Sequence, residues 1–145
     1  MIQKILKNNS VLAIILRANY QSEGIEFFTP NDFSQQLGYM NRPKGYEIPP
    51  HMHNKVVRNV EFTNEVLLIK SGKVRVDFYD ENKTYFQSEI LNKGDVILLV
   101  KGGHGFEMIE KSEIIEIKQG PYVDDKDKTR FTSVDKEKIQ LKEKI

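Results

Sequence analysis

The sequence contains no cysteine, which excludes disulfide bonds and thiolate metal ligands. Any bound metal ion would therefore be held by histidine and carboxylate side chains alone. Neither sign of charge is in excess, since 22 Lys and Arg residues balance 21 Asp and Glu residues, for a net charge of +1. A nucleic-acid-binding protein needs a concentrated basic surface to neutralise phosphates, so we expect no nucleic-acid partner.

Long apolar runs are missing as well. No segment approaches the roughly 20 apolar residues that span a bilayer, and the apolar run at 11–16 is short and follows no cationic leader. We therefore expect no membrane span and a cytoplasmic location. The 145 residues, of which 39% are hydrophobic and 30% charged, suit one ordinary globular domain with its own core.

Most of the chain has the pattern of short β-strands. Segments rich in β-branched and aromatic residues lie at 11–17, 65–70, 73–79, 84–91, 95–100, 104–109 and 113–118. Turn-forming clusters of Gly, Asn, Asp and Lys separate them at 70–73, 80–83, 92–95 and 101–103. This spacing predicts an all-β sandwich or barrel.

Two of these segments have distinct burial patterns. In 73–79, alternation places Val74, Val76 and Phe78 on a core face, and Asp77 and Tyr79 on a face exposed to water. The segment 96–100 is apolar at every position, which predicts a strand covered on both faces.

The chain changes character after Val123. A charge run at 124–128 is followed by a charged segment with sparse apolar positions. We divide the chain into a β domain at 1–123 and a partly ordered tail at 124–145, either a short helix or irregular. Tyr122 and Phe131 would pack this tail on the domain; alternatively, Tyr122 or Arg130 closes one end of a pocket.

All three histidines of the chain belong to two short motifs. His51 and His53 are two residues apart, so in an extended strand both imidazoles point to one face. Pro49 and Pro50 favour an extended entry to this segment. His104 follows a pair of glycines, whose turns can aim its side chain inward. These residues are candidates for one shared metal site.

The wider spacing resembles the two motifs of the cupin superfamily. Gly45, five residues and His51-x-His53, followed later by Glu65, six residues and Gly72, resemble the first motif. Gly94, Val100 in the place of a proline, Gly102 and His104 resemble the second. The resemblance covers about residues 43–119 and implies a double-stranded β-barrel, or jelly roll. It also implies a divalent metal ion (Fe, Mn, Ni or Zn) bound by His51, His53, Glu65 and His104.

Two departures from the motifs concern the ligands. The gap between His53 and Glu65 is longer than in the family pattern, which makes Glu61 an alternative carboxylate ligand. Only Glu65 keeps the six-residue distance to Gly72, and we favour it. The gap before His104 is one residue shorter, which the preceding Gly-Gly pair can absorb.

Cationic and aromatic residues near the motifs are candidates for a ligand-binding rim. For contact with a small anionic or polar molecule we select Arg42, Lys44, Arg58, Lys101 and Tyr122. Several cations at one mouth favour a phosphorylated or carboxylated ligand.

Three functions follow from the resemblance and stay open. The first is a metal-dependent enzyme, an isomerase or oxygenase acting on a small molecule such as a sugar derivative. The second is a ligand-binding module without catalysis. The third is a metal-free sugar isomerase or epimerase, in which His51 or His53 acts as base and Tyr46 as acid. The segments at 36–40 and 45–51 are similar to small cupins of surface-polysaccharide and nucleotide-sugar metabolism.

Cupins commonly pair through exposed edge strands, so we expect a homodimer. The apolar segment 11–16 is the predicted edge.

Overall fold

The computed structural model describes residues 1–142, which fold almost entirely as β-strands and connecting loops. The strands are β1 (Ile2–Lys7), β2 (Ser10–Leu16), β3 (Gly24–Phe27), β4 (Gly38–Asn41), β5 (Glu65–Ser71), β6 (Lys73–Tyr79), β7 (Tyr85–Asn92), β8 (Val96–Leu99), β9 (Gly103–Met108) and β10 (Glu113–Lys118). Two short 3-10 turns follow, η1 (Asp124–Asp127) and η2 (Lys136–Lys138). The all-β prediction is confirmed, and the seven segments predicted as strands at 11–17 and between 65 and 118 are present as β2 and β5–β10, with ends shifted by no more than one residue.

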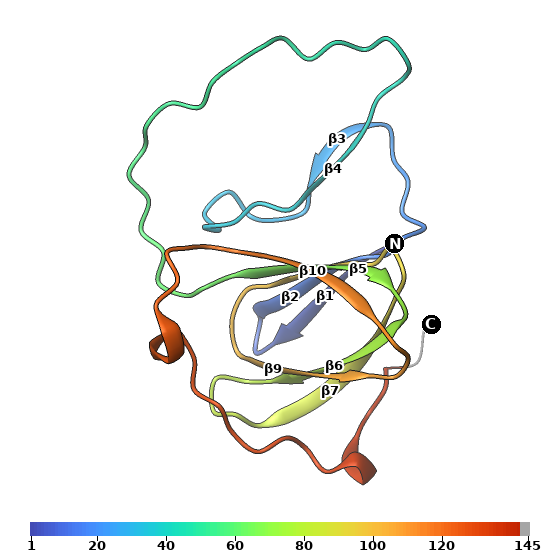
Figure 1. Ribbon diagram of the computed structural model, residues 1–145, viewed down its shortest axis with the longest axis vertical. Helices are drawn as coiled ribbons and strands as arrows, with labels where there is room; N and C mark the ends of the chain where they lie inside the picture. The colour runs from blue at the N-terminus through green and yellow to red at the C-terminus, as the bar shows by residue number, and fades with distance from the viewer. Residues whose placement is uncertain (143–145) are drawn as a thin grey trace.

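Two antiparallel sheets form the body of the molecule (Figure 1). One sheet has the order β1–β2–β8–β5–β10, and the other has the order β7–β6–β9. A separate hairpin, β3–β4, lies above the larger sheet in the view of Figure 1. Over the described residues these sheets do not close into a barrel.

The segment 11–16 does not form the exposed edge that we predicted. It lies in β2, which pairs with β1 on one side and with β8 on the other. Both backbone edges of β2 are therefore occupied, and it cannot pair with a second copy. The sequence analysis did not predict β1, which is the edge strand of this sheet beside β2.

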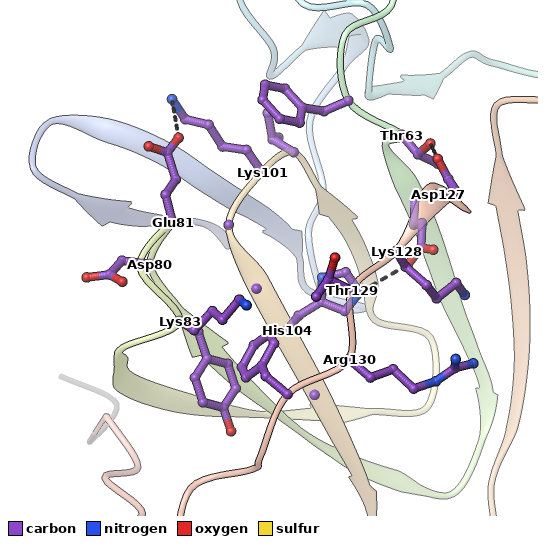
Figure 2. Close-up of a pocket in the computed structure, with 18 of the residues that line it drawn as sticks. Thr63, Asp80, Glu81, Lys83, Lys101, His104, Asp127, Lys128, Thr129 and Arg130 are labelled. Carbon is purple, nitrogen blue, oxygen red and sulfur yellow. Dashed lines mark hydrogen bonds and ion pairs between the residues drawn. The ribbon is translucent and has the colours of Figure 1, made fainter. Parts of the chain in front are cut away.

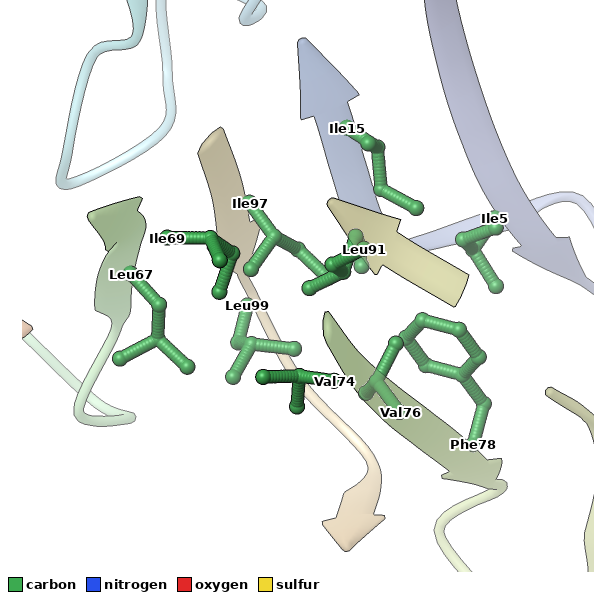
Figure 3. Packing of buried hydrophobic residues seen from close by; sticks show 11 residues of the cluster. Ile5, Ile15, Leu67, Ile69, Val74, Val76, Phe78, Leu91, Ile97 and Leu99 are labelled. Carbon is green, nitrogen blue, oxygen red and sulfur yellow. The ribbon is translucent and has the colours of Figure 1, made fainter. Parts of the chain in front are cut away.

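The main core lies between the two sheets (Figure 3). Its buried members are Ile5, Ala13, Ile15, Leu67, Ile69, Val74, Val76, Phe78, Leu91, Ile97 and Leu99. The predicted core face of β6 is confirmed, since Val74, Val76 and Phe78 are at most 2% exposed.

A second apolar cluster covers the outer face of the larger sheet. Ile14 and Leu98 from the sheet pack with Phe28 and Leu37 from the hairpin region. The Tyr20 ring meets Phe28 and Tyr39 edge-on, at centroid distances of 5.3 and 5.1 Å. β8 is consequently covered on both sides, as its continuous apolar sequence predicted.

The other face of β6 is not open to water, contrary to our prediction. Asp77 and Tyr79 are only 5% and 3% exposed. The Phe131 ring packs edge-on against the Tyr79 ring at 5.0 Å, and the Tyr79 hydroxyl accepts a hydrogen bond from the Val134 backbone nitrogen at 2.9 Å. The C-terminal segment therefore covers this face, and the predicted packing role of Phe131 is confirmed.

The same segment continues along β7. Leu141 forms a parallel bridge with Ser88, and the Gln140 backbone nitrogen donates to the Tyr85 hydroxyl at 2.7 Å. The predicted tail is thus attached at several points up to residue 142, and its only helical turns among the described residues are the two short 3-10 turns η1 and η2. Residues 143–145 of that tail lie outside the described residues.

An ionic network is buried on the side where β1 and β7 meet. Arg17 is 6% exposed and donates to Asp95 at 2.9 Å and to Glu89 at 3.1 Å. Gln3 accepts a hydrogen bond from Arg17 at 2.7 Å. Burial raises the pKa of Glu89, while Arg17 and Gln3 act in the opposite direction. The network joins Gln3 of β1 and Glu89 of β7 to Arg17, which directly follows β2, and to Asp95, which directly precedes β8.

No helix among residues 1–142 has the length and apolar character needed to cross a bilayer.

Candidate functional site

A cavity of about 720 Å³ lies at one end of the sandwich (Figure 2). The start of β5, the β6–β7 turn and the β8–β9 connection form part of its wall, and residues 127–131 and 133 form the rest. The C-terminal segment therefore serves two purposes, since it covers β6 and also lines the cavity.

Glu65 and His104 meet inside this cavity. Glu65 is the first residue of β5, and His104 is the second residue of β9, opposite Phe78 on the core face of β6. His104 Nε2 lies within hydrogen-bonding distance of Glu65 Oε2, at 3.2 Å, with side chains 30% and 17% exposed. This hydrogen bond lowers the pKa of Glu65, and the charges of Lys118 and Lys128 act in the same direction. Glu65 is thus held as a carboxylate, in reach of solvent through the cavity.

Glycine at 102 and 103 allows the chain to carry His104 to this position. Gly102 has a φ of 76°, and a Cβ there would lie 2.6 Å from the Tyr79 carbonyl oxygen. A Cβ at Gly103 would lie 2.7 Å from the Phe131 ring. The sequence prediction that this glycine pair positions His104 agrees with the geometry.

Charged side chains of both signs surround the pair (Figure 2). The cations that line the cavity are Lys83, Lys101, Lys128 and Arg130, and the acidic residues besides Glu65 are Asp80, Glu81 and Asp127. Lys101 lies 3.8 Å from Glu81, which is 68% exposed. Thr63 donates to Asp127 at 2.7 Å and fixes the C-terminal segment to the start of β5. Such a wall can contact anionic groups as well as hydroxyl groups.

Aromatic rings supply the apolar part of the wall. Phe62, Tyr79 and Phe131 line the cavity, and the Lys83 ammonium lies 5.9 Å from the centre of the Phe131 ring. A ligand with both an apolar face and polar edges would match this combination.

His51 and His53 lie elsewhere. Both are exposed within residues 42–64, which contain no strand, so the predicted extended strand at 51–53 is wrong for this structure. Their rings are 5.4 Å apart, and His51 Nδ1 is 3.0 Å from the Pro49 carbonyl oxygen. Among residues 1–142, no three His, Cys, Asp or Glu side chains come together as a metal-binding group.

The remaining predicted site residues are divided between the cavity and the exposed segment. Lys101 lines the cavity, whereas Arg42, Lys44, Tyr46, Arg58 and Glu61 lie in the exposed segment. The Arg42 guanidinium stacks over the Tyr46 ring at 4.6 Å. Tyr122 is 75% exposed, and it is Arg130 that lines the cavity.

Sequence reasoning missed Lys83, Lys128 and Thr129 as cavity residues. Lys83 sits in a turn with a φ of 64°, a position that the pattern identified only as a reversal. Lys128 and Thr129 belong to the segment that the charge run indicated as solvated. The only indication in the sequence that this segment packs against the domain was the presence of Arg130 and Phe131 within it.

Comparisons of the chain with protein-family models, with curated proteins and with solved structures found no match.

Proposed function

We propose that this protein is a metal-binding cupin that acts as an enzyme on a small polar or anionic molecule, such as a sugar derivative. The observation that carries the proposal is the Glu65–His104 contact of 3.2 Å inside a cavity of about 720 Å³. Glu65 belongs to the first sequence motif and His104 to the second. Their contact is what we expect if the two motifs build one site.

The donors present fit a divalent metal ion in part. A carboxylate oxygen and an imidazole nitrogen are suitable ligands for Fe, Mn, Ni or Zn. Two such donors are together at the cavity, and a stable site needs more. His51 and His53 are the remaining histidines of the chain, and they would complete the set if residues 49–55 moved to the cavity.

The open side of the sandwich provides a place for this segment. β9 pairs with β6 alone and β10 with β5 alone among the described strands, so each has one free edge. A strand formed by residues 49–55 along the free edge of β9 would place His51 and His53 on one face, beside His104. It would also add the strand needed to close the sandwich into a jelly roll.

A bound metal ion would act as a Lewis acid on a carbonyl or hydroxyl oxygen, or activate dioxygen if it is iron. The residues of the chain have separate tasks. His104 and Glu65 hold each other in position, and Lys83, Lys101 and Lys128 attract phosphate or carboxylate groups. Tyr79 and Phe131 exclude water from one wall and can pack against a sugar ring.

Elemental analysis of protein purified without a metal-binding tag tests the proposal. About one equivalent of Fe, Mn, Ni or Zn per chain is expected, and the variants Glu65→Gln, His104→Ala and His51→Ala should each lose it. Glu61→Gln is the matched control and should retain the metal, because the carboxylate beside His104 is that of Glu65 and not that of Glu61.

Wild-type protein that stays free of metal after incubation with all four ions would refute the metal site. Two alternatives would then remain, a ligand-binding module and a metal-free isomerase. Thermal-shift screening of sugar nucleotides and sugar acids would distinguish them. A ligand recovered unchanged indicates binding, and its conversion indicates catalysis.

A further inference from the structure

Lys83 has a backbone conformation that is unusual for its residue type. It lies in the turn between β6 and β7 and has a φ of 64°, in the left-handed region that glycine and asparagine adopt more readily. The carboxylate of Asp80 stabilises this turn, because its Oδ1 accepts hydrogen bonds from the backbone nitrogens of Asn82 and Thr84 at 2.9 and 3.0 Å. Backbone strain of this kind concentrates at functional sites, so it indicates a role for the Lys83 side chain.

The Lys83 side chain points toward β9, whereas the Asp80 carboxylate of the same turn points away from β9 (Figure 2). The Lys83 ammonium lies 5.9 Å from the centre of the Phe131 ring. That ring lies over Gly103, where an added Cβ would be 2.7 Å from it. Lys83 therefore places a positive charge beside the aromatic wall of the cavity.

Each carboxylate of the cavity wall already has a partner other than Lys83. The pairs are Glu65 with His104, Asp127 with Thr63, Glu81 with Lys101, and Asp80 with the backbone of its own turn. Among the described side chains, no carboxylate lies within ion-pair distance of the Lys83 ammonium. Lys128 and Arg130 extend away from β9 (Figure 2). The positive charge of Lys83 is thus available to a ligand.

We infer that Lys83 binds the phosphate group of the substrate, and that the cavity selects phosphate monoesters over carboxylates. The inference rests on the proposed function and adds the substrate class to it. A phosphate monoester carries a charge of about −2 near pH 7 and three terminal oxygens, which match the compact ammonium of lysine with its three donors. Planar carboxylates are typically bound by the fork of an arginine, and Arg130 is turned away from β9.

The wall beside Lys83 indicates the character of the rest of the substrate. Tyr79 and Phe131 line the cavity next to Lys83, and the Glu65–His104 pair lines the same cavity. A volume of about 720 Å³ is in the range of small-molecule sites. A phosphorylated ring compound of sugar size can therefore contact Lys83 through its phosphate and pack its ring against an aromatic side chain.

Isothermal titration calorimetry of chelator-treated protein at low ionic strength tests the inference. Without metal, any binding of phosphate is due to the side chains of the chain itself. Wild-type protein should bind inorganic phosphate and glucose 6-phosphate. Glucuronate carries a carboxylate on the same kind of ring and should bind about tenfold more weakly than glucose 6-phosphate.

The substitution Lys83→Asn removes the charge and suits the turn, because asparagine tolerates the left-handed conformation better than lysine does. Its thermal unfolding should match or exceed that of wild type. Its dissociation constant for glucose 6-phosphate should rise about tenfold or more, since a charge-assisted hydrogen bond is lost. Lys83→Gln, with a longer polar side chain, should show the same loss, and Lys83→Arg should keep most of the affinity.

Lys93→Asn is the matched control, because Lys93 is also an exposed lysine in a turn. It follows β7, whose last residue, Asn92, pairs with Lys73 at the end of β6 opposite the cavity. Its dissociation constant should equal that of wild type. The inference would be overturned by equal affinity of wild type and Lys83→Asn, by an equal loss in Lys93→Asn, or by glucuronate binding as tightly as glucose 6-phosphate. Absence of binding of both phosphate probes to wild type would overturn it too.

This titration and the metal analysis can fail separately. Phosphate binding that depends on Lys83, in a protein that never takes up metal, would support the phosphate site and refute the metal site. Metal bound by wild type and lost in His104→Ala, together with phosphate binding that Lys83→Asn leaves unchanged, would support the metal site and refute the phosphate site.

Discussion

The buried network around Arg17 permits a quantitative prediction. The substitution Arg17→Met keeps an unbranched apolar stem but removes the cation that Glu89 and Asp95 contact at 3.1 and 2.9 Å. Removing one partner of a buried ion pair typically costs about 3–5 kcal/mol, because the remaining charge stays buried without compensation. We expect the lower end, about 3 kcal/mol, since Asp95 still accepts hydrogen bonds from the backbone nitrogens of Ala18 and Asn92.

Urea unfolding followed by circular dichroism measures this loss. With a denaturant slope of about 2 kcal/mol per molar, the midpoint should fall by about 1.5 M. Lys70→Met is the control, because the Lys70–Glu113 pair is 58% and 59% exposed and such surface pairs contribute at most about 1 kcal/mol. A loss below about 1 kcal/mol for Arg17→Met, or an equal loss for Lys70→Met, would refute the reasoning.

The pH dependence of the same variant has a definite sign. Burial raises the pKa of Glu89 in the folded protein, and Arg17 opposes that rise. Without Arg17 the folded state binds a proton on Glu89 more readily than the unfolded state does. The stabilisation from this proton is present at low pH and is lost as the pH rises through the folded pKa. Arg17→Met should therefore lose more stability at about pH 8 than at about pH 5, relative to wild type, and the opposite order would contradict this account.

Two further substitutions test the C-terminal segment and the β5–β6 turn. Phe131→Ala removes the ring that packs on Tyr79 and should speed tryptic cleavage after Lys128 and Arg130 while the β-sheet circular dichroism is retained; unchanged cleavage would show that the ring does not hold the segment. Gly72→Ala should lower the free energy of unfolding by at least about 2 kcal/mol, because φ is +81° and the new Cβ would lie 2.3 Å from the Lys111 carbonyl oxygen. Gly45→Ala has a φ of +84° but no atom within 4 Å, so thermal unfolding should show a smaller loss, and equal losses would exclude the clash as the cause.

The fold was predictable where local pattern decides it. Alternation in 73–79 and continuous apolar sequence in 96–100 gave both the strands and the buried faces of β6 and β8. Local pattern did not reveal β1, whose apolar residues Ile2, Ile5 and Leu6 do not alternate, or the four-residue strands β3 and β4. Nor did it reveal the burial of Tyr79, because Phe131 and Val134, which contact its side chain, lie more than 50 positions later in the sequence.

The candidate site divides in the same way. Motif spacing identified Glu65 and His104, and the structure brings them together because β5 and β9 belong to facing sheets. His51 and His53 lie in the exposed segment 42–64, and no local signal in the sequence shows where that segment lies relative to the cavity. The sequence did not identify Lys83 and Lys128 as cavity residues. Turn and charge patterns indicate that a residue is exposed, but they do not indicate which part of the protein it faces.

The course of the C-terminal segment couples two distant parts of the molecule. Residues 127–131 line the cavity, whereas Leu141 is bridged to Ser88 on β7. A ligand that contacts Lys128 or Phe131 stabilises the attached form of the segment, and thermodynamic reciprocity requires that attachment at Leu141 strengthen ligand binding by the same factor. Slower amide hydrogen exchange at residues 140–142 would thus report occupancy of a cavity that those residues never touch.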